Sequence, residues 1–182
     1  TRYLTNGTRQ SPQLDLSSVG NIANSSIRWQ DKTGLNFDGV DDYVDCGELS
    51  STELLERAEI EIYFPIDYTG ESVYAPIFSK DTNYIFWAGD FTGNITGETL
   101  LIQDGTNYTY TTDTIPQGWH NLVVEWDGSN YKFYLDNSLM NMQSYNGHST
   151  KMPLDQMFLA HRPSSNYAEI KISYAKFEVA TQ

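Results

Sequence analysis

Acidic residues form the densest group of potential metal ligands in this sequence. Four aspartates, Asp38, Asp41, Asp42 and Asp45, fall within eight residues, and Glu48 follows them. Calcium takes about six to eight oxygen ligands, mostly carboxylates and backbone carbonyls of one loop. The spacing differs from the alternating aspartates of an EF-hand loop, so a calcium site here would be of another kind.

A second acidic pair, Glu59 and Glu61, has a spacing that a glycosidase could use. Retaining glycosidases hold two carboxyl groups about 5–5.5 Å apart, and alternate residues of a strand are separated by a similar distance. Ile60 and Ile62 alternate with these glutamates, which is typical of charges that face solvent while the isoleucines enter a core. No Ser or Cys stands at a recognisable catalytic spacing from the histidines, which are His120, His148 and His161. We therefore predict that the protein is not an enzyme.

Aromatic side chains offer a third kind of chemistry, the stacking of sugar rings. The sequence is 14% aromatic and contains 13 tyrosines. A sugar presents C–H groups to an aromatic face, and neighbouring Asp, Asn or Arg side chains bond its hydroxyls. Three segments compete for this role, at residues 84–90, 108–110 and 162–167, although the core also needs aromatics. The candidate carbohydrate-binding residues are Tyr84, Trp87 and Asp90, which we expect to form the main patch, with Tyr108 and Tyr110.

Short strands must position these residues, because helical periodicity is nearly absent. The one helical candidate is a capped turn at residues 50–57. Asp38-Gly39 and Asp127-Gly128 have the composition of turns that join strands. Ten or more short strands separated by turn residues indicate a sandwich or a jelly roll. The expected strands are 35–37, 43–46, 59–64, 75–79, 84–87, 99–103, 108–112, 120–126, 131–135, 157–160 and 169–179.

Charge and composition exclude several classes of partner. Asp and Glu number 24 against 11 Lys and Arg, a net charge of -13 that repels nucleic acid. No run of residues is long and apolar enough to insert into a membrane.

The single cysteine, Cys46, cannot form an internal disulfide and is expected to be a small buried hydrophobe. Because the chain does not begin with Met, we expect a processed or excised piece of a larger protein.

Two longer phrases carry a family resemblance, one at residues 35–47 (LNFDGVDDYVDCG) and one at residues 118–137 (GWHNLVVEWDGSNYKFYLDN). Together they resemble the concanavalin A-like lectin/glucanase superfamily, in its laminin-G-like (pentraxin-like) jelly-roll branch. The resemblance implies an all-β concanavalin A-like jelly-roll sandwich of two antiparallel sheets and covers roughly residues 29–179. We expect a single domain at 29–182, with residues 1–28 as a lead-in segment that wraps the sandwich edge.

The resemblance also has implications for the acidic residues. Many members of the superfamily bind calcium through loop aspartates, which makes Asp41 and Asp42 the candidate metal ligands and Ca²⁺ the candidate cofactor. Laminarinase-like members carry their catalytic acids in a pattern like E-x-D-x-x-E. Here Glu61 replaces the aspartate, and Tyr63 and Phe64 stand where the last glutamate should be. This departure argues against hydrolysis.

The two phrases have a packing explanation as well. Alternation predicts that Phe37, Tyr43 and Val44 point into the core between the sheets. Trp119 is expected to be a core anchor, and His120 a residue at the start of a strand with a hydrogen-bonded ring.

These observations predict a general class of function and do not specify the ligand. We expect a non-catalytic, lectin-like glycan-recognition domain whose partner is a glycan or polysaccharide. It would belong to a larger secreted, adhesive or phage (virion) attachment protein and lie outside the cell, on a cell surface or on a virion surface. The alternative is a structural or protein-interaction module that decorates such an assembly and contacts its other subunits. A glycan hydrolase is the less favoured reading.

Overall fold

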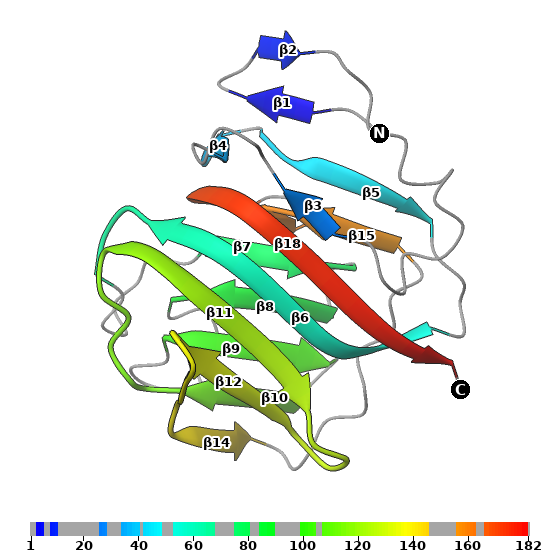
Figure 1. The fold of residues 1–182 in the computed structure, drawn as a ribbon, viewed down its shortest axis with the longest axis vertical. Coiled ribbons are helices and arrows are strands. Elements are labelled where there is room, and N and C mark those ends of the chain that lie inside the picture. The colour runs from blue at the N-terminus through cyan, green and yellow to red at the C-terminus, as the bar shows by residue number, and fades with distance from the viewer. Residues whose placement is uncertain are drawn as a thin grey trace.

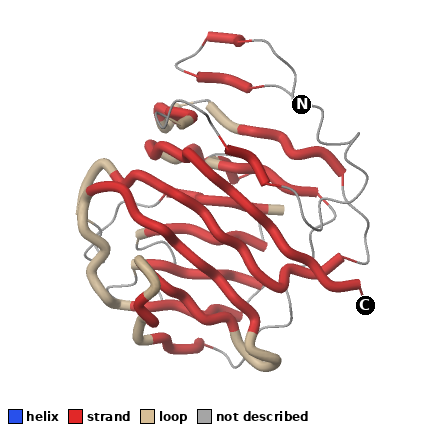
Figure 2. Tube along the Cα trace, in the orientation of Figure 1, coloured by secondary structure: helices blue, strands red, loops and turns tan. Residues whose placement is uncertain are grey.

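Strands account for all of the regular elements that the structure describes. The computed structural model describes residues 3–5, 8–10, 26–28, 34–40, 42–48, 53–67, 75–80, 84–89, 99–104, 107–145, 156–162 and 166–181. Figures 1 and 2 show these residues as strands and loops only. The strands are β1 (Tyr3–Thr5), β2 (Thr8–Gln10), β3 (Ser26–Arg28), β4 (Leu35–Asp38), β5 (Val44–Glu48), β6 (Glu53–Phe64), β7 (Ala75–Ser79), β8 (Tyr84–Ala88), β9 (Leu100–Asp104), β10 (Asn107–Thr111), β11 (Gly118–Trp126), β12 (Tyr131–Leu135), β13 (Ser138–Leu139), β14 (Met142–Tyr145), β15 (Gln156–Leu159), β16 (His161–Arg162), β17 (Asn166–Tyr167) and β18 (Glu169–Thr181).

Two large antiparallel sheets form the two layers of the molecule. The nine-stranded sheet has the order β14-β10-β9-β8-β7-β15-β5-β1-β2, and the seven-stranded sheet has the order β13-β12-β11-β6-β18-β3, with β4 also paired to β18. In Figure 1 the seven-stranded sheet lies in front of strands β7 to β10 of the other sheet. The strands β16 and β17 form a separate two-stranded ribbon. This arrangement confirms the expected sandwich of two antiparallel sheets.

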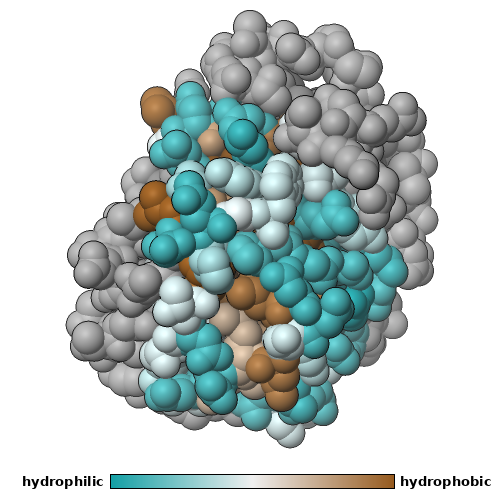
Figure 3. Space-filling model, turned by 60° about the vertical axis from the view of Figure 1, so that its left-hand side comes forward, coloured by the Kyte–Doolittle hydropathy of each residue, from teal (hydrophilic) through white to brown (hydrophobic). Residues whose placement is uncertain are grey.

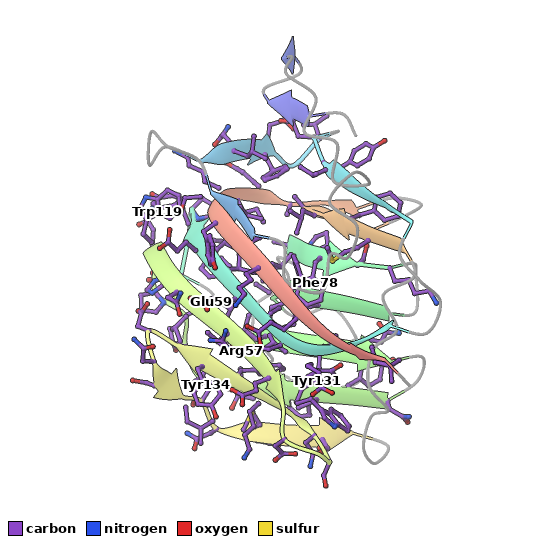
Figure 4. The ribbon with its side chains drawn as sticks, turned by 45° about the vertical axis from the view of Figure 1, so that its right-hand side comes forward. Arg57, Glu59, Phe78, Trp119, Tyr131 and Tyr134 are labelled. Atoms are coloured by element: carbon purple, nitrogen blue, oxygen red, sulfur yellow. The ribbon has the colours of Figure 1, made fainter. Side chains whose placement is uncertain are left out.

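The core lies between the two sheets and is rich in phenylalanine. Phe78 and Phe86 come from the nine-stranded sheet, with ring centroids 5.1 Å apart. From the seven-stranded sheet, Phe133 packs 5.6 Å from Phe86 and Phe177 packs 5.3 Å from Phe78. Tyr131 is also buried there, and its hydroxyl donates a hydrogen bond to the carbonyl oxygen of Leu55 at 3.0 Å. Figure 4 labels Phe78 and Tyr131 within this layer of side chains.

The strand β6 overturns the helical turn expected at residues 50–57. The strand begins at Glu53, and Leu55 is fully buried in the core. Ala58 is also buried, although it lies three residues further along rather than two. The pairing of β6 with β18 shifts by one residue at this point, so that Glu56 is the extra residue of a β-bulge. A bulge produces an apolar spacing of three, which in sequence is easily read as one turn of helix.

Both Asp-Gly pairs occupy turns, as expected. Gly39 has a φ of 77°, and the Asp38 carboxylate accepts a hydrogen bond from the backbone N–H of Val40 at 2.8 Å. Gly128 has a φ of 100°, and the Asp127 carboxylate accepts from the N–H groups of Ser129 and Asn130. Glycine tolerates these left-handed conformations, and the aspartate replaces a backbone partner.

The N-terminal strands extend both sheets. The strands β1 and β2 form the edge of the nine-stranded sheet beyond β5, and β3 pairs with β18 at the edge of the seven-stranded sheet. The boundary expected at residue 28 stays a prediction. Among the described residues there is no helix with the length and apolar character needed to cross a lipid bilayer.

Candidate carbohydrate-binding surface

The outer face of the nine-stranded sheet, meaning the face turned away from the core, carries most of the aromatic candidates. In β9, Leu100 and Ile102 belong to the core, so the alternate residues Leu101 and Gln103 occupy the outer face. Paired residues of antiparallel strands share a face. The register therefore extends this face from β9 across the neighbouring strands.

Two tyrosines of β10 lie on this outer face. Tyr110 pairs with Leu101, and Tyr108 pairs with Gln103, while Thr109 faces the core. The Tyr110 hydroxyl donates a hydrogen bond to the side-chain oxygen of Gln143 at 2.9 Å, and Gln143 itself is exposed on β14. The ring of Tyr110 is 9% exposed and Tyr108 is half-buried. As expected, the two tyrosines line one face and alternate with threonines on the other.

The register of β8 separates two of the candidates that the sequence places together. Trp87 pairs with Leu101 and therefore occupies an outer-face position in line with Tyr110. Tyr84 pairs with Asp104 and lies two residues before Phe86, which is fully buried in the core, so Tyr84 and Phe86 hold positions on the same face. Trp87 and Tyr84 thus hold positions on opposite faces of the sheet. Asp90 lies outside the described residues, and the role of all three in binding stays a prediction.

Two further aromatic residues extend the outer face toward β5. Phe158 of β15 pairs with Ser79, and its ring meets that of Tyr43 edge-on with centroids 6.1 Å apart. Tyr43 was expected in the core and is instead half-buried on the outer face, because the next residue, Val44, takes the core position. Sequence reasoning also missed Phe158 and Gln143. Their only signal is the pairing of strands that are distant in sequence.

The candidate calcium ligands lie in a loop whose described carboxylates bond the backbone. Asp42 is fully buried, and one of its oxygens accepts the backbone N–H of Asp38 at 3.3 Å. Asp38 caps its own turn, and Asp41 lies outside the described residues. Within the described part of the chain, no three His, Cys, Asp or Glu side chains gather as a metal site. Asp42 thus has a backbone partner within this loop, and calcium binding stays a prediction.

The acidic pair of β6 lies on the outer face of the seven-stranded sheet, where Figure 4 labels Arg57 and Glu59. Ile60 and Ile62 point into the core, as the alternation predicted. Glu59 forms an ion pair with Arg57 at 2.9 Å, and Glu61 accepts a hydrogen bond from the Ser173 hydroxyl at 2.9 Å. These contacts give both carboxylates a structural role.

Trp119 is not the core anchor that its place in the sequence suggested. Its side chain is 44% exposed, and its ring meets that of Tyr63 edge-on with centroids 5.7 Å apart. Trp119 pairs with Tyr63 on the outer face, whereas the next residue, His120, pairs with the buried Ile62. The strand β11 therefore begins one residue out of phase with the expected alternation.

The ring of His120 is hydrogen-bonded at both nitrogens, as expected. Its Nδ1 lies 2.8 Å from an oxygen of Asp136, and its Nε2 lies 2.9 Å from the carbonyl oxygen of Pro116. Burial alone would raise the pKa of Asp136. The hydrogen bonds from His120 and from the Asn121 N–H outweigh it, so this pKa lies below its usual value. This network fixes the start of β11.

The sheet order and core define the fold as a concanavalin A-like jelly-roll sandwich. No protein-family model matches the sequence, and no curated protein matches it. Among solved structures, the chain is similar to domain 4 of AbnA, a GH43 extracellular arabinanase from Geobacillus stearothermophilus solved in complex with arabinotriose. The identity is 11%, the TM-score is 0.56, and the match covers 87% of this chain and 77% of that domain.

Two further similarities have lower TM-scores. The heptameric SAP-like pentraxin of Limulus polyphemus is 14% identical with a TM-score of 0.49, and covers 87% of this chain and 76% of its own. The CBM40 of the Ruminococcus gnavus IT-sialidase, bound to alpha2,3 sialyllactose, is 9% identical with a TM-score of 0.49, and covers 87% of this chain and 92% of its own. The similarity to the AbnA domain supports the fold, and at 11% identity it does not extend to function.

Proposed function

We propose that the protein is a non-catalytic glycan-binding domain whose binding surface is the outer face of the nine-stranded sheet. The observation that carries this proposal is one row of paired positions across four strands, made of Gln143, Tyr110, Leu101 and Trp87. Tyr108 lies in the adjoining row. Aromatic and amide side chains along one face are what an extended sugar chain needs.

The described members of this surface differ in exposure, and Leu101 is fully buried, so it supports the row without reaching a ligand. The half-buried ring of Tyr108 offers a face for the C–H groups of a sugar. The exposed amide of Gln143, already held by the Tyr110 hydroxyl, can bond sugar hydroxyls on its remaining donors and acceptor. Tyr110 is almost fully buried, so it orients Gln143 and adds little contact area of its own.

The similarity to the AbnA domain supports the same class of ligand. The AbnA domain was solved with arabinotriose, so a sandwich of this shape is compatible with a neutral oligosaccharide. A short α-linked or β-linked neutral oligosaccharide is therefore the ligand we favour for this chain. We also propose an extracellular location, as part of a larger secreted, adhesive or virion attachment protein with other subunits or domains.

A glycan array followed by calorimetry tests the proposal. We expect at least one neutral glycan to bind, with Trp87→Ala weakening the affinity about thirtyfold, the loss typical of an aromatic anchor. The matched control is Tyr134→Ala, which removes a half-buried tyrosine from the outer face of the other sheet and should leave the affinity unchanged. Thermal melting of each variant separates lost binding from lost folding.

The contrary result is equally definite. A chain that binds no glycan with or without calcium, and that retains one specific protein in a pull-down, is a structural or protein-interaction module. Trp87→Ala that lowers stability by several kcal/mol would assign Trp87 to packing and leave Tyr108 as the sugar contact.

A further inference from the structure

Trp119 is a large exposed aromatic residue on the face opposite the proposed glycan surface. Its side chain is 44% exposed on the outer face of the seven-stranded sheet. Figure 4 places it at the margin of the molecule where β11 begins, well apart from Tyr134. This tryptophan lies outside the core, so its exposed surface is available for contact with a ligand.

The backbone around Trp119 is held by hydrogen bonds on both sides. The N–H of Gln117 donates to the Asp67 carboxylate at 2.6 Å, and its side-chain amide donates to the Pro65 carbonyl at 2.7 Å. On the other side, the ring of His120 bonds both Pro116 and Asp136. An aromatic side chain on a rigid backbone loses little conformational entropy when a ligand binds.

Trp119 lies in a row of three residues with complementary chemistry. Trp119 pairs with Tyr63, and Tyr63 pairs with Lys171, across the adjacent strands β11, β6 and β18. The Lys171 ammonium lies 5.2 Å from the centre of the Tyr63 ring. The adjoining row contains Asn121 and Glu61, which pair with one another. The group therefore combines an aromatic surface with a cationic donor, an amide and a carboxylate.

We propose that Trp119, Tyr63 and Lys171 form a second binding site, for one neutral sugar unit. The indole stacks on the C–H face of the ring, Lys171 donates to a hydroxyl, and Asn121 and Glu61 supply the acceptors. This site is separate from the proposed function, because it uses none of the residues of the nine-stranded sheet.

Size and charge favour a neutral sugar over other occupants. The exposed large hydrophobic residues among those described are Val40, Ile66, Trp119 and Leu139, and Figure 3 shows brown areas within a largely hydrophilic surface, whereas a stable protein interface needs about 800 Å² from each partner. The net charge of -13 and the nearby Glu61 oppose a polyanion, even with Lys171 present. One stacked ring with three polar partners matches the kinds of side chain in this group.

The site has a physical consequence for the whole domain. The two sheets are about 10 Å apart, and their outer faces point in opposite directions. One short oligosaccharide cannot reach both sites, so a domain with two sites would join two glycan chains.

Nuclear magnetic resonance of the indole N–H groups tests this inference directly. The chain has four tryptophans, and Trp119→Phe identifies the Trp119 signal. The probes are arabinotriose, xylotriose, cellotriose and maltotriose, each titrated into the wild type and into Tyr108→Ala. We expect at least one of them to shift the Trp119 signal saturably in both proteins, while the signal of Trp126, which packs against Tyr131, stays in place. Lys171→Ala should weaken this binding as reported by the Trp119 signal. Calorimetry in the Tyr108→Ala background should show a loss of about tenfold or more for Trp119→Ala.

Three results overturn the inference. The first is a Trp119 signal that none of the four sugars moves. The second is a shift that disappears in Tyr108→Ala, because it would then report the other face. The third is a shift that survives Lys171→Ala with unchanged affinity. Loss of binding at the nine-stranded sheet with the Trp119 shift intact would count against the proposed function alone.

Discussion

Phe86 and Trp119 are both large aromatic residues on strands, but their contributions to stability should differ. Phe86 is fully buried between Phe78 and Phe133, so Phe86→Ala should lower the free energy of unfolding by about 3–5 kcal/mol. Trp119→Ala removes mainly one edge contact with Tyr63, worth about 0.5–1.5 kcal/mol. Urea denaturation of both variants measures the difference. Equal losses would place Trp119 in the core after all.

Asp127 provides a test of stability against pH. The N–H groups of Asn130 and Ser129 and the Lys132 ammonium lower the pKa of this carboxyl from 3.8 to about 2. Because the folded-state pKa is the lower one, the stabilisation is complete above the unfolded value and disappears as the pH falls through about 2. Asp127→Asn should therefore melt below the wild type at pH 6, with a gap that closes toward pH 2. A gap that is constant with pH would contradict the ionic contribution.

For individual residues, the alternation in the sequence locates core positions only where it is clear which residues of the strand face inward. Phe37 and Val44 are buried as expected. The predictions that Tyr43 and Trp119 are core residues were wrong, because each lies next to a residue that takes the core position in its place. Alternation specifies two faces, but it does not say which face turns inward when both carry aromatics.

The strand β6 gives a prediction at the scale of an element. Leu55 is fully buried just before the bulge at Glu56, so Leu55→Ala should cost about 2–5 kcal/mol of stability. The control Glu56→Ala changes a half-buried polar residue and should be nearly neutral. Chemical denaturation measures both variants. Two near-neutral variants would instead favour the capped helical turn that the sequence predicts for residues 50–57.

The loop between β4 and β5 gives a second prediction at this scale, which concerns calcium. A ligand that binds only the folded state raises its stability by about 2.7 kcal/mol at a concentration of 100 Kd. If Asp41 and Asp42 ligate calcium, millimolar calcium should raise the melting temperature relative to a chelator, and Asp41→Asn should abolish that rise. Asp41→Asn is preferred to Asp42→Asn, because Asp42 already accepts the N–H of Asp38 and its loss would destabilise the loop without a metal. An unchanged melting temperature in the wild type would remove calcium from the proposal.

Turns and strand composition made most of the elements predictable, whereas their pairing was not. The Asp38-Gly39 and Asp127-Gly128 turns follow from local chemistry. The neighbours of a strand depend on residues far away in the sequence, such as Phe158 beside Ser79. The outer-face row that supports the proposed function is a product of such pairing, so only its individual aromatics could be chosen in advance.

For the whole molecule, the net charge of -13 separates two kinds of partner. Affinity for a neutral glycan should change little between about 50 mM and 500 mM salt, because screening acts on charge pairs and leaves stacking intact. A basic protein partner would bind much more weakly at the higher salt concentration. Calorimetry at the two ionic strengths measures this, and a steep salt dependence would favour the protein-interaction module.

The strand β18, at residues 169–181, lies inside the seven-stranded sheet between β6 and the edge strand β3, and also pairs with β4. On a ribosome, β3, β4 and β6 emerge long before the strand that joins them. Until β18 follows, the backbone of one edge of β6 lacks a hydrogen-bonding partner strand. Such an edge exposes unpaired backbone N–H and C=O groups, which can pair with strands of other nascent chains. We therefore expect folding to occur late, in one step after synthesis of β18, and chains cut short before residue 169 to need a chaperone or to aggregate.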